Sequence, residues 1–170
     1  MKRIVSLSVI LSLAVWGVAC AQGDGKMKIT SPAFTHNQSI PKKFTCQGED
    51  INPELVFEGI PAGTKSLALI VDDPDAPMGT WVHWVIFDIA PTTTQIAEKS
   101  IPGKQGWNDF GRKDYGGPCP PSGTHRYFHK IYALDTMLNL KEGVKKSELE
   151  KAMKGHILDQ AEMIGLYKKS

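Results

Sequence analysis

The stretch Ser66-Leu67-Ala68-Leu69-Ile70-Val71-Asp72-Asp73-Pro74-Asp75-Ala76-Pro77 joins a continuous apolar run to an acidic, proline-containing segment. A short uncharged run that is rich in branched residues and ends at such a segment is typical of a buried strand. Pro74 and Pro77 fix the backbone φ angle and lack an N–H, so they cannot continue a strand ladder. We therefore expect a strand over 66–71 that runs directly into a rigid acidic loop.

Two further apolar segments, Trp81–Ile89 and His125–Asp135, also have the pattern of strands. In the first segment, strict alternation gives two faces that are both mainly apolar, which favours a central strand covered on both sides. One face would hold Trp81, His83, Val85, Phe87 and Ile89, and the other Val82, Trp84, Ile86 and Asp88. In the second segment, His125, Tyr127, His129 and Ile131 alternate with Arg126, Phe128, Lys130 and Tyr132.

The remaining chain adds loops and one clear helix. Residues 102–124 are rich in Gly and Pro and form a long irregular connection, which in a compact domain is usually either functional or disordered. Its aromatic residues Trp107, Phe110 and Tyr115 argue against disorder. Ser147 and Glu150 match a capping box, which predicts a helix from Ser147 that fades near Leu158. Met163–Tyr167 is interpreted as a closing strand, with a continued helix as the alternative. The prediction is a mostly-β fold, an antiparallel β-sandwich with one or two short helices.

The N-terminal residues predict export. Lys2 and Arg3 precede the uncharged run Ile4–Ala19, and Ala19 and Ala21 place small residues before a cleavage point at Gln22. This layout is typical of a secretory signal peptide over 1–21, followed by one domain over 22–170. A retained anchor and a lipoprotein modified at Cys20 are the two alternatives. The expected mature protein is periplasmic or secreted and has no transmembrane span.

Composition limits the class of partner. The chain has 20 Lys and Arg against 18 Asp and Glu, and the signal segment removes Lys2 and Arg3, which leaves 18 of each. A domain with zero net charge and no basic stripe is not expected to bind nucleic acid. The mature length, 170 minus 21 or about 149 residues, suffices for one hydrophobic core but not for two typical domains.

Two cysteines, Cys46 and Cys119, remain after removal of the signal. In an exported protein they have the opportunity to form a disulfide. Closing a loop of that length would stabilise the fold by roughly 4 kcal/mol in the chain-entropy model. The spacing alone does not distinguish a disulfide from two separate buried thiols, so both interpretations stay open.

Polar residues lie at the ends of the three predicted strands. His125 and Tyr127 share a strand face, and convergence with Asp73 and His83 would give one pocket with two imidazoles, a phenol and a carboxylate. Imidazole N–H and phenol O–H groups donate hydrogen bonds well to phosphate or carboxylate oxygens. A carboxylate beside a histidine orients the ring and favours its charged form. His129 lies further along the strand, and we expect it to be structural.

Four motifs occur in order along the chain: Asp73-Pro74-Asp75-Ala76-Pro77, Trp81-Val82-His83, Gly117-Pro118-Cys119-Pro120-Pro121 and His125-Arg126-Tyr127. Together they resemble the phosphatidylethanolamine-binding protein family, in particular its bacterial branch of Raf kinase inhibitor-like proteins, the YbhB/YbcL type. The resemblance extends roughly from Ile29 to Tyr167. It implies a large antiparallel β-sandwich with a small pocket for phosphate-like groups, such as a phosphorylethanolamine head.

The resemblance also implies roles for single residues. Asp73, His83, His125 and Tyr127 correspond to the polar residues of the family's pocket. Its walls correspond to Pro77, Trp81, Gly117 and Pro118. Asp75 and Arg126 fit the motifs as structural charges that brace the loops.

The sequence therefore predicts an exported, non-catalytic binding protein without a cofactor. Its ligand would be a small phosphate- or carboxylate-bearing molecule, and a protein partner such as a kinase or protease is a further possibility by analogy with relatives. A hydrolase of phosphoesters or peptides is the alternative; the chain has no G-x-S-x-G or HExxH motif, and Cys119 with His125 is the one tempting nucleophile pair. A zinc site of Asp73, His83 and His125 is a further hypothesis, although no metal is expected.

Overall fold

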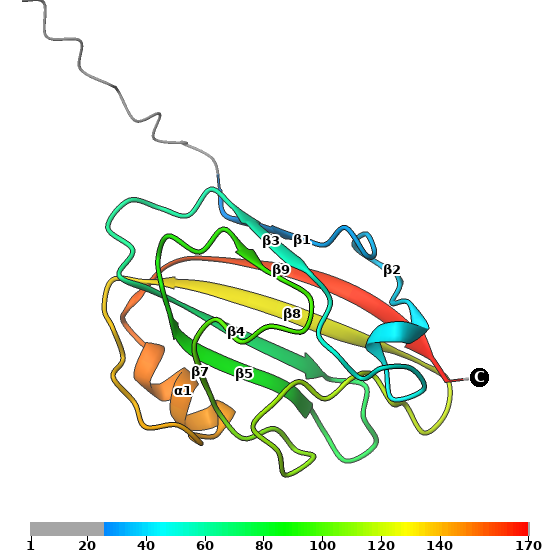
Figure 1. Cartoon of the computed structure of the whole chain (residues 1–170). Coiled ribbons are helices and arrows are strands. Elements are labelled where there is room, and N and C mark those ends of the chain that lie inside the picture. Colours follow the sequence, from blue (N-terminus) through cyan, green and yellow to red (C-terminus); the bar gives the residue numbers. More distant parts are fainter. Residues whose placement is uncertain (1–25, 170) are drawn as a thin grey trace, which may run out of the picture.

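The computed structural model describes residues 26–169 (Figure 1). The predicted signal peptide over 1–21, with Cys20, lies outside the described residues. Within 26–169, no helix combines the length and apolar character needed to cross a membrane.

Two β-sheets make up the fold (Figure 1). The larger sheet has six strands in the order β2 (Gln38–Ser39), β9 (Ile157–Lys168), β8 (Thr124–Leu134), β4 (Ser66–Asp73), β5 (Trp81–Ile89) and β7 (Lys104–Gln105). The smaller sheet has three strands in the order β1 (Lys28–Thr30), β3 (Leu55–Glu58) and β6 (Gln95–Ile96). A short 3-10 helix, η1 (Lys42–Phe44), follows β2. Neighbouring strands are antiparallel except β2 and β9, which are parallel.

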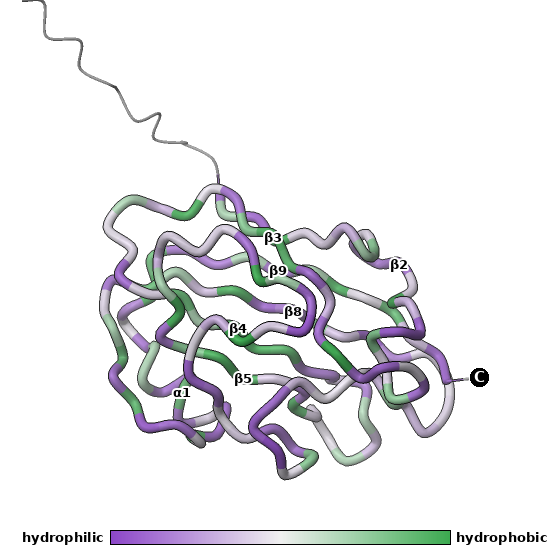
Figure 2. Tube along the Cα trace, viewed as in Figure 1, coloured by the Kyte–Doolittle hydropathy of each residue, from purple (hydrophilic) through white to green (hydrophobic). Residues whose placement is uncertain are grey.

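The main core lies between the two sheets, as the prediction of a sandwich requires. Its buried side chains come from both layers: Ile29, Leu55, Phe57 and Ile96 from the smaller sheet, and Leu67, Leu69, Trp84, Ile131 and Met163 from the larger one. Figure 2 shows hydrophobic segments along the inner strands β4 and β5. The predicted mostly-β, antiparallel sandwich is therefore confirmed.

A second apolar cluster covers the outer face of β4 and β5. Helix α1 (Lys146–Met153) packs Leu149 and Met153 against this face. The strand residues of the cluster are Ala68, Ile70, Val82, Val85 and Phe87, together with Leu134 at the end of β8. Both faces of β4 are therefore buried, which explains the continuous apolar run in its sequence.

The predicted face assignment of Trp81–Ile89 is wrong because the strand contains two irregularities. Val71 pairs with Trp84 and the next residue, Asp72, pairs with Val82, so His83 is an extra residue without a partner on β4. A bulge of this kind bends the strand and re-aims a side chain. As a result, Val82 lies in the outer cluster with Val85, on the face opposite to that of Trp84 in the core between the sheets. A second shift, near Asp88, whose φ is +53°, returns Ile89 to the inner core.

The helix begins earlier than predicted, and the proposed capping box is wrong. Lys145 is the N-cap residue, and its backbone N–H donates to the carboxylate of Glu148 at 2.8 Å. Ser147 is instead inside the first turn. The short spacing of acidic residues explains the error, because Glu148 and Glu150 are both plausible partners in the sequence and only the backbone path selects one.

The end of the chain is a strand, and it is longer than predicted. The helix ends at Met153 rather than near Leu158, and Gly155 follows with φ of +84°, a conformation that favours glycine and reverses the chain. Strand β9 then runs from Ile157 to Lys168 and pairs with β8 over its length. The continued helix is therefore excluded, and the closing strand is confirmed.

Candidate functional site

A cavity of about 310 Å³ lies where β4 ends, β5 begins and β8 begins. Loops following β4 and preceding β8 close its sides. Its lining consists of Asp73, Ala76, Pro77, Met78, Trp81, His83, Phe110, Cys119, Pro120, Pro121, His125 and Tyr127. Strands from three different parts of the sequence thus deliver a carboxylate, two imidazoles and a phenol to one small space.

The structure brings together six of the eight residues that the sequence pointed to: Asp73, Pro77, Trp81, His83, His125 and Tyr127. Gly117 and Pro118 do not line the cavity. The Gly117 N–H donates to Asp50, and the Pro118 carbonyl accepts from the Cys46 N–H at 3.2 Å. Their backbone groups bond to the segment around Cys46, so these residues support the wall of the cavity without contacting its interior.

Sequence reasoning missed the apolar rim of the cavity. Phe110, Met78, Pro120 and Pro121 line it, and 95% of Met78 is exposed to solvent. Isolated apolar residues in loops carry no periodic signal. The one available signal was the cluster of aromatic residues in the long segment 102–124, where an ordered loop is expected to be functional.

Asp73 and His125 form a buried pair on the floor of the cavity. The His125 Nδ1–H donates to Asp73 Oδ2 at 2.7 Å, and the Asp75 backbone N–H donates to Asp73 Oδ1 at 2.8 Å. Both side chains are less than a tenth exposed. The carboxylate therefore orients the imidazole and leaves its Nε2 as the free polar atom of the ring.

His83 is held from the opposite side. A carbonyl oxygen accepts only, so the 2.6 Å contact between His83 Nδ1 and the Gly116 carbonyl places the proton on Nδ1. Burial lowers the pKa of His83 below its usual value, against the opposing effect of that carbonyl and of nearby carboxylates. The rings of Phe110 and Tyr127 contact the imidazole edge to face, with centroids at 5.2 and 5.1 Å. The free ring atom is again Nε2.

The Tyr127 hydroxyl is buried and has no hydrogen-bond partner in the described structure. Burial raises the pKa of the phenol, so the hydroxyl keeps its proton and remains a donor. The neighbouring Cys119 backbone N–H opposes part of this rise, but its geometry does not satisfy a hydrogen bond. An unpaired buried hydroxyl costs free energy, so a group that lines a cavity in this state points to a ligand.

Asp75 and Arg126 behave as the sequence analysis expected of bracing charges. Arg126 donates to both carboxylate oxygens of Asp75, at 2.9 and 2.7 Å, and its backbone N–H adds a third bond at 3.0 Å. The guanidinium holds the pKa of Asp75 at about 2. The pair ties the loop after β4 to the start of β8 and does not line the cavity.

His129 is structural, as expected. It is buried, its Nδ1–H donates to the Tyr127 carbonyl at 3.2 Å, and its ring lies 5.6 Å from that of Phe34. Burial lowers its pKa to about 4. The imidazole is therefore neutral at physiological pH.

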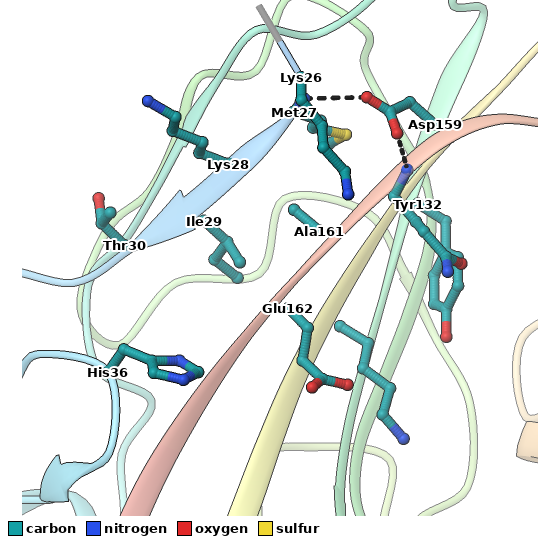
Figure 3. Close-up of a pocket in the computed structure, with 12 residues that line it drawn as sticks. Lys26, Met27, Lys28, Ile29, Thr30, His36, Tyr132, Asp159, Ala161 and Glu162 are labelled. Atoms are coloured by element: carbon teal, nitrogen blue, oxygen red, sulfur yellow. Dashed lines mark hydrogen bonds between the residues drawn. The ribbon is translucent and has the colours of Figure 1, made fainter.

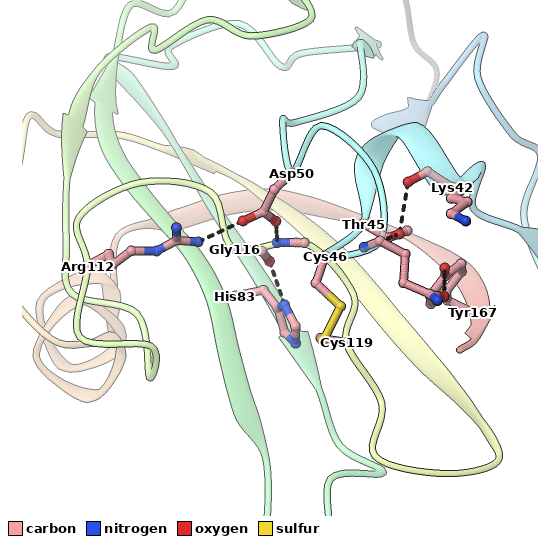
Figure 4. The surroundings of a disulfide bond; sticks show 11 residues. Lys42, Thr45, Cys46, Asp50, His83, Arg112, Gly116, Cys119 and Tyr167 are labelled. Atoms are coloured by element: carbon pink, nitrogen blue, oxygen red, sulfur yellow. Dashed lines mark hydrogen bonds and ion pairs between the residues drawn. A yellow bond between two sulfur atoms is a disulfide. The ribbon is translucent and has the colours of Figure 1, made fainter. Parts of the chain in front are cut away.

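Cys46 and Cys119 form a disulfide (Figure 4). Their Cα atoms lie 5.5 Å apart, a normal separation for such a bond. Because Cys119 lines the cavity, the bond anchors one wall to the segment that follows η1. The Cys119 sulfur, considered above as a nucleophile beside His125, is thus already bonded to the Cys46 sulfur.

A larger groove of about 830 Å³ lies between β1 and β9 (Figure 3). Its polar groups are already paired in part: the Met27 backbone N–H donates to Asp159 at 2.9 Å, and Lys130 reaches Asp72. No buried unpaired side-chain atom lines it. The smaller cavity, where buried polar atoms converge, is the stronger candidate.

No group of three metal-binding side chains is arranged to hold an ion anywhere in residues 26–169. Asp73, His83 and His125 therefore do not form the zinc site considered from the sequence. The Asp73 carboxylate instead accepts from the His125 Nδ1–H and from the Asp75 backbone N–H.

Comparison with known proteins identifies the family to which the fold belongs. The family model described as phosphatidylethanolamine-binding protein matches residues 30–168. This chain belongs to the phosphatidylethanolamine-binding protein family. The UPF0098 protein PH1269 of Pyrococcus horikoshii is 48% identical over 182 aligned residues, which cover 99% of this chain and 91% of the relative.

Solved structures of the phosphatidylethanolamine-binding protein family agree. The family homologue CT736 of Chlamydia trachomatis is 44% identical, with a TM-score of 0.83 over 85% of this chain and 99% of that one. The E. coli protein YbcL, described as a new member of the mammalian family, is 29% identical, with a TM-score of 0.79 over 86% of this chain and 100% of that one. The YbhB/YbcL-like branch expected from the motifs therefore fits.

Proposed function

We propose that this member of the phosphatidylethanolamine-binding protein family is an exported binding protein that holds a small phosphate- or carboxylate-bearing ligand without converting it. The Tyr127 hydroxyl carries the proposal, because it is a buried donor without a partner that lines the cavity. A ligand oxygen would accept its hydrogen bond and remove the cost of leaving it unpaired.

The two histidines complete a receptor for an anion. Each uses Nδ1 on the protein, at Gly116 or Asp73, and keeps Nε2 for a ligand. When protonated, each Nε2–H donates a charge-assisted hydrogen bond to an oxyanion. Tyr127 supplies the third donor, so the cavity offers three donors to one head group.

The apolar rim suits a ligand with a non-polar part beyond its anionic head. Trp81 and Phe110 stand edge to face with centroids 5.5 Å apart, and Met78 and Pro77 lie beside them. Apolar walls around a few convergent polar groups are typical of small-molecule sites.

The disulfide has two consequences: it favours binding over hydrolysis, and it supports export. The Cys119 sulfur is part of a disulfide and is not available as a nucleophile beside His125. Disulfides persist mainly in exported proteins, which agrees with the signal-like segment at residues 1–21.

The first test is an NMR titration of residues 22–170 with phosphorylethanolamine, following the His83 and His125 ring signals and the ligand's 31P signal. Saturable shifts of both rings are expected, with no new 31P signal from a cleaved product. Tyr127→Phe removes only the unpartnered hydroxyl and is expected to weaken binding about tenfold, the value of one hydrogen bond to a charged group.

Tyr132→Phe is the matched control, because Tyr132 lies on the same strand but its side chain does not line this cavity. It is expected to leave the affinity unchanged. Silent histidine rings with phosphorylethanolamine, inorganic phosphate and acetate would reject the binding site, and release of inorganic phosphate would favour the hydrolase.

Anion binding is expected to strengthen as the pH falls. The pKa of free His83 lies below its usual value of 6.5, so the ring is neutral at pH 7, while a bound anion favours the charged ring. Binding therefore takes up a proton, and the affinity rises by up to about tenfold per pH unit. Sulfate is the suitable probe between pH 8 and 6, because its own charge is constant there.

In His83→Gln the same titration is expected to lose most of this slope, because the amide does not titrate. A sulfate affinity that is independent of pH in the unmodified protein would contradict the assignment of His83 as a ligand-binding imidazole.

A further inference from the structure

One peptide group connects the cavity to a carboxylate outside it. The Gly116 carbonyl accepts from His83 Nδ1–H at 2.6 Å, and the N–H of the same peptide unit, which belongs to Gly117, donates to Asp50 Oδ1 at 2.6 Å. Figure 4 shows the contacts from Asp50 through Gly116 to His83. Asp50 itself does not line the cavity.

The two hydrogen bonds polarise the same amide in the same direction. A carboxylate that accepts from the amide N–H shifts electron density toward the carbonyl oxygen, and chains of hydrogen bonds strengthen one another in this way. The carbonyl then becomes a stronger acceptor for the His83 Nδ1–H. A neutral ring is held in the Nδ1–H tautomer, and a protonated ring is stabilised.

We propose that Asp50 is a positioning residue that acts on His83 through the Gly116–Gly117 peptide group, setting its tautomer and supporting its charged form when an anion is bound. The three parts together are called the Asp50–peptide–His83 relay. Its consequence for the ligand rests on the proposed function, whereas the coupling itself is a property of the free protein.

The local sequence is built for this contact. A Cβ on Gly117 would lie 2.6 Å from both Asp50 Oδ1 and the Phe44 carbonyl, so only glycine lets the backbone approach the carboxylate. Asp50 adopts φ of +56°, in the left-handed region that is unfavourable for most side chains but tolerated by Asp and Asn. Strain of this kind is retained where the surrounding contacts need it.

Other charged and titratable groups also act on His83. Asp73 and Asp72 belong to β4, and Tyr127 and His129 belong to β8. Asp73 and Asp72, together with Asp50, raise the pKa of His83 against the larger lowering by burial. Asp50 differs from the other two because it is in addition hydrogen-bonded to the peptide group that His83 contacts.

Arg112 provides a way to separate the relay from loop structure. It pairs with the other oxygen of Asp50 at 3.1 Å and also donates to the Tyr115 carbonyl at 3.3 Å. Arg112→Gln therefore disturbs the same loop while leaving the Asp50–Gly117 bond in place. Asp50→Asn keeps the shape, the acceptor oxygen and the tolerated backbone angle but removes the charge.

The experiment measures the 15N signals of the His83 ring against pH in the ligand-free protein. In Asp50→Asn the His83 pKa is expected to fall by about one unit relative to the unmodified protein, and the Nδ1–H tautomer to lose population. Arg112→Gln is expected to leave the pKa unchanged or to raise it, because the carboxylate is then less neutralised. Equal effects of both variants, or no effect of Asp50→Asn, would overturn the proposal.

A second measurement needs no variant. In the unmodified protein the Gly117 amide 15N signal is expected to titrate with the His83 ring, because the ring is hydrogen-bonded to the carbonyl of the same peptide group. An amide signal that stays constant through the His83 titration would overturn the relay even if Asp50→Asn did not fold.

Inorganic phosphate binding, measured on the same samples, separates the relay from the function of the site. The affinity at pH 7 is expected to fall about tenfold in Asp50→Asn, which corresponds to one unit of His83 pKa. Coupling of His83 to Gly117 in a protein that binds no phosphate would support the relay and reject the proposed function.

Discussion

Replacement of Cys46 and Cys119 together by serine is expected to lower the free energy of unfolding by roughly 4 kcal/mol. The bond joins residues 73 positions apart, and a link over that distance removes much of the conformational freedom of the unfolded chain. Urea unfolding at pH 7 measures the change. Because Cys119 lines the cavity, the variant is also expected to bind phosphorylethanolamine more weakly.

Reduction of the unmodified protein serves as the control, since it removes the bond without changing a residue. A reductant is expected to lower the urea midpoint of the unmodified protein and to leave that of the double variant unchanged. A loss below about 1 kcal/mol would mean that the Cys46 N–H bond to the Pro118 carbonyl and the packing around it already hold the loop.

Acidification is expected to destabilise the protein by about 3 kcal/mol through His129 alone. In the folded protein burial holds the pKa of His129 at about 4, whereas the unfolded chain has the usual value of 6.5. Between these values the unfolded state binds the proton and the folded state does not. The free energy of unfolding therefore falls as the pH drops from about 6.5 to about 4, and urea unfolding over this range measures it.

His129→Leu is expected to remove most of this pH dependence while keeping a buried side chain of similar size. It also removes the Nε2 atom, which has no hydrogen-bond partner in the described structure, so stability at pH 7 is not expected to fall much. His156→Gln is the control, because His156 is exposed and pairs with Asp135 at the surface. If His129→Leu keeps the full acid sensitivity, other groups are responsible for it.

Much of the fold was predictable because its strands carry strong local signals. The run at 66–71 became β4, Trp81–Ile89 became β5 with the predicted bounds, and His125–Asp135 matches β8 within one residue at each end. The short strands β1, β2, β3, β6 and β7 were not predicted. Each has two to four residues, which is too short for a clear alternation.

The site was predictable at its polar centre and not at its rim. Asp73, His83, His125 and Tyr127 stand at strand ends in motifs, and the structure places all four on one cavity. Gly117 and Pro118, predicted for its walls, do not line the cavity, because their backbone groups bond to Asp50 and Cys46 instead. Phe110 reaches the cavity only because the long loop folds back over β5.

The sequence by itself determined the long strands, the sandwich class, the family and the four polar residues of the pocket, since these depend on local periodicity and short motifs. Only the tertiary structure decided which atoms of those residues remain for a ligand. The bulge that turns His83 inward, the Gly116 carbonyl that takes its Nδ1–H and the Asp50 carboxylate behind that peptide come from distant segments. Hydrogen-bond direction and ring tautomer depend on these contacts in space, and no pattern along the chain encodes them.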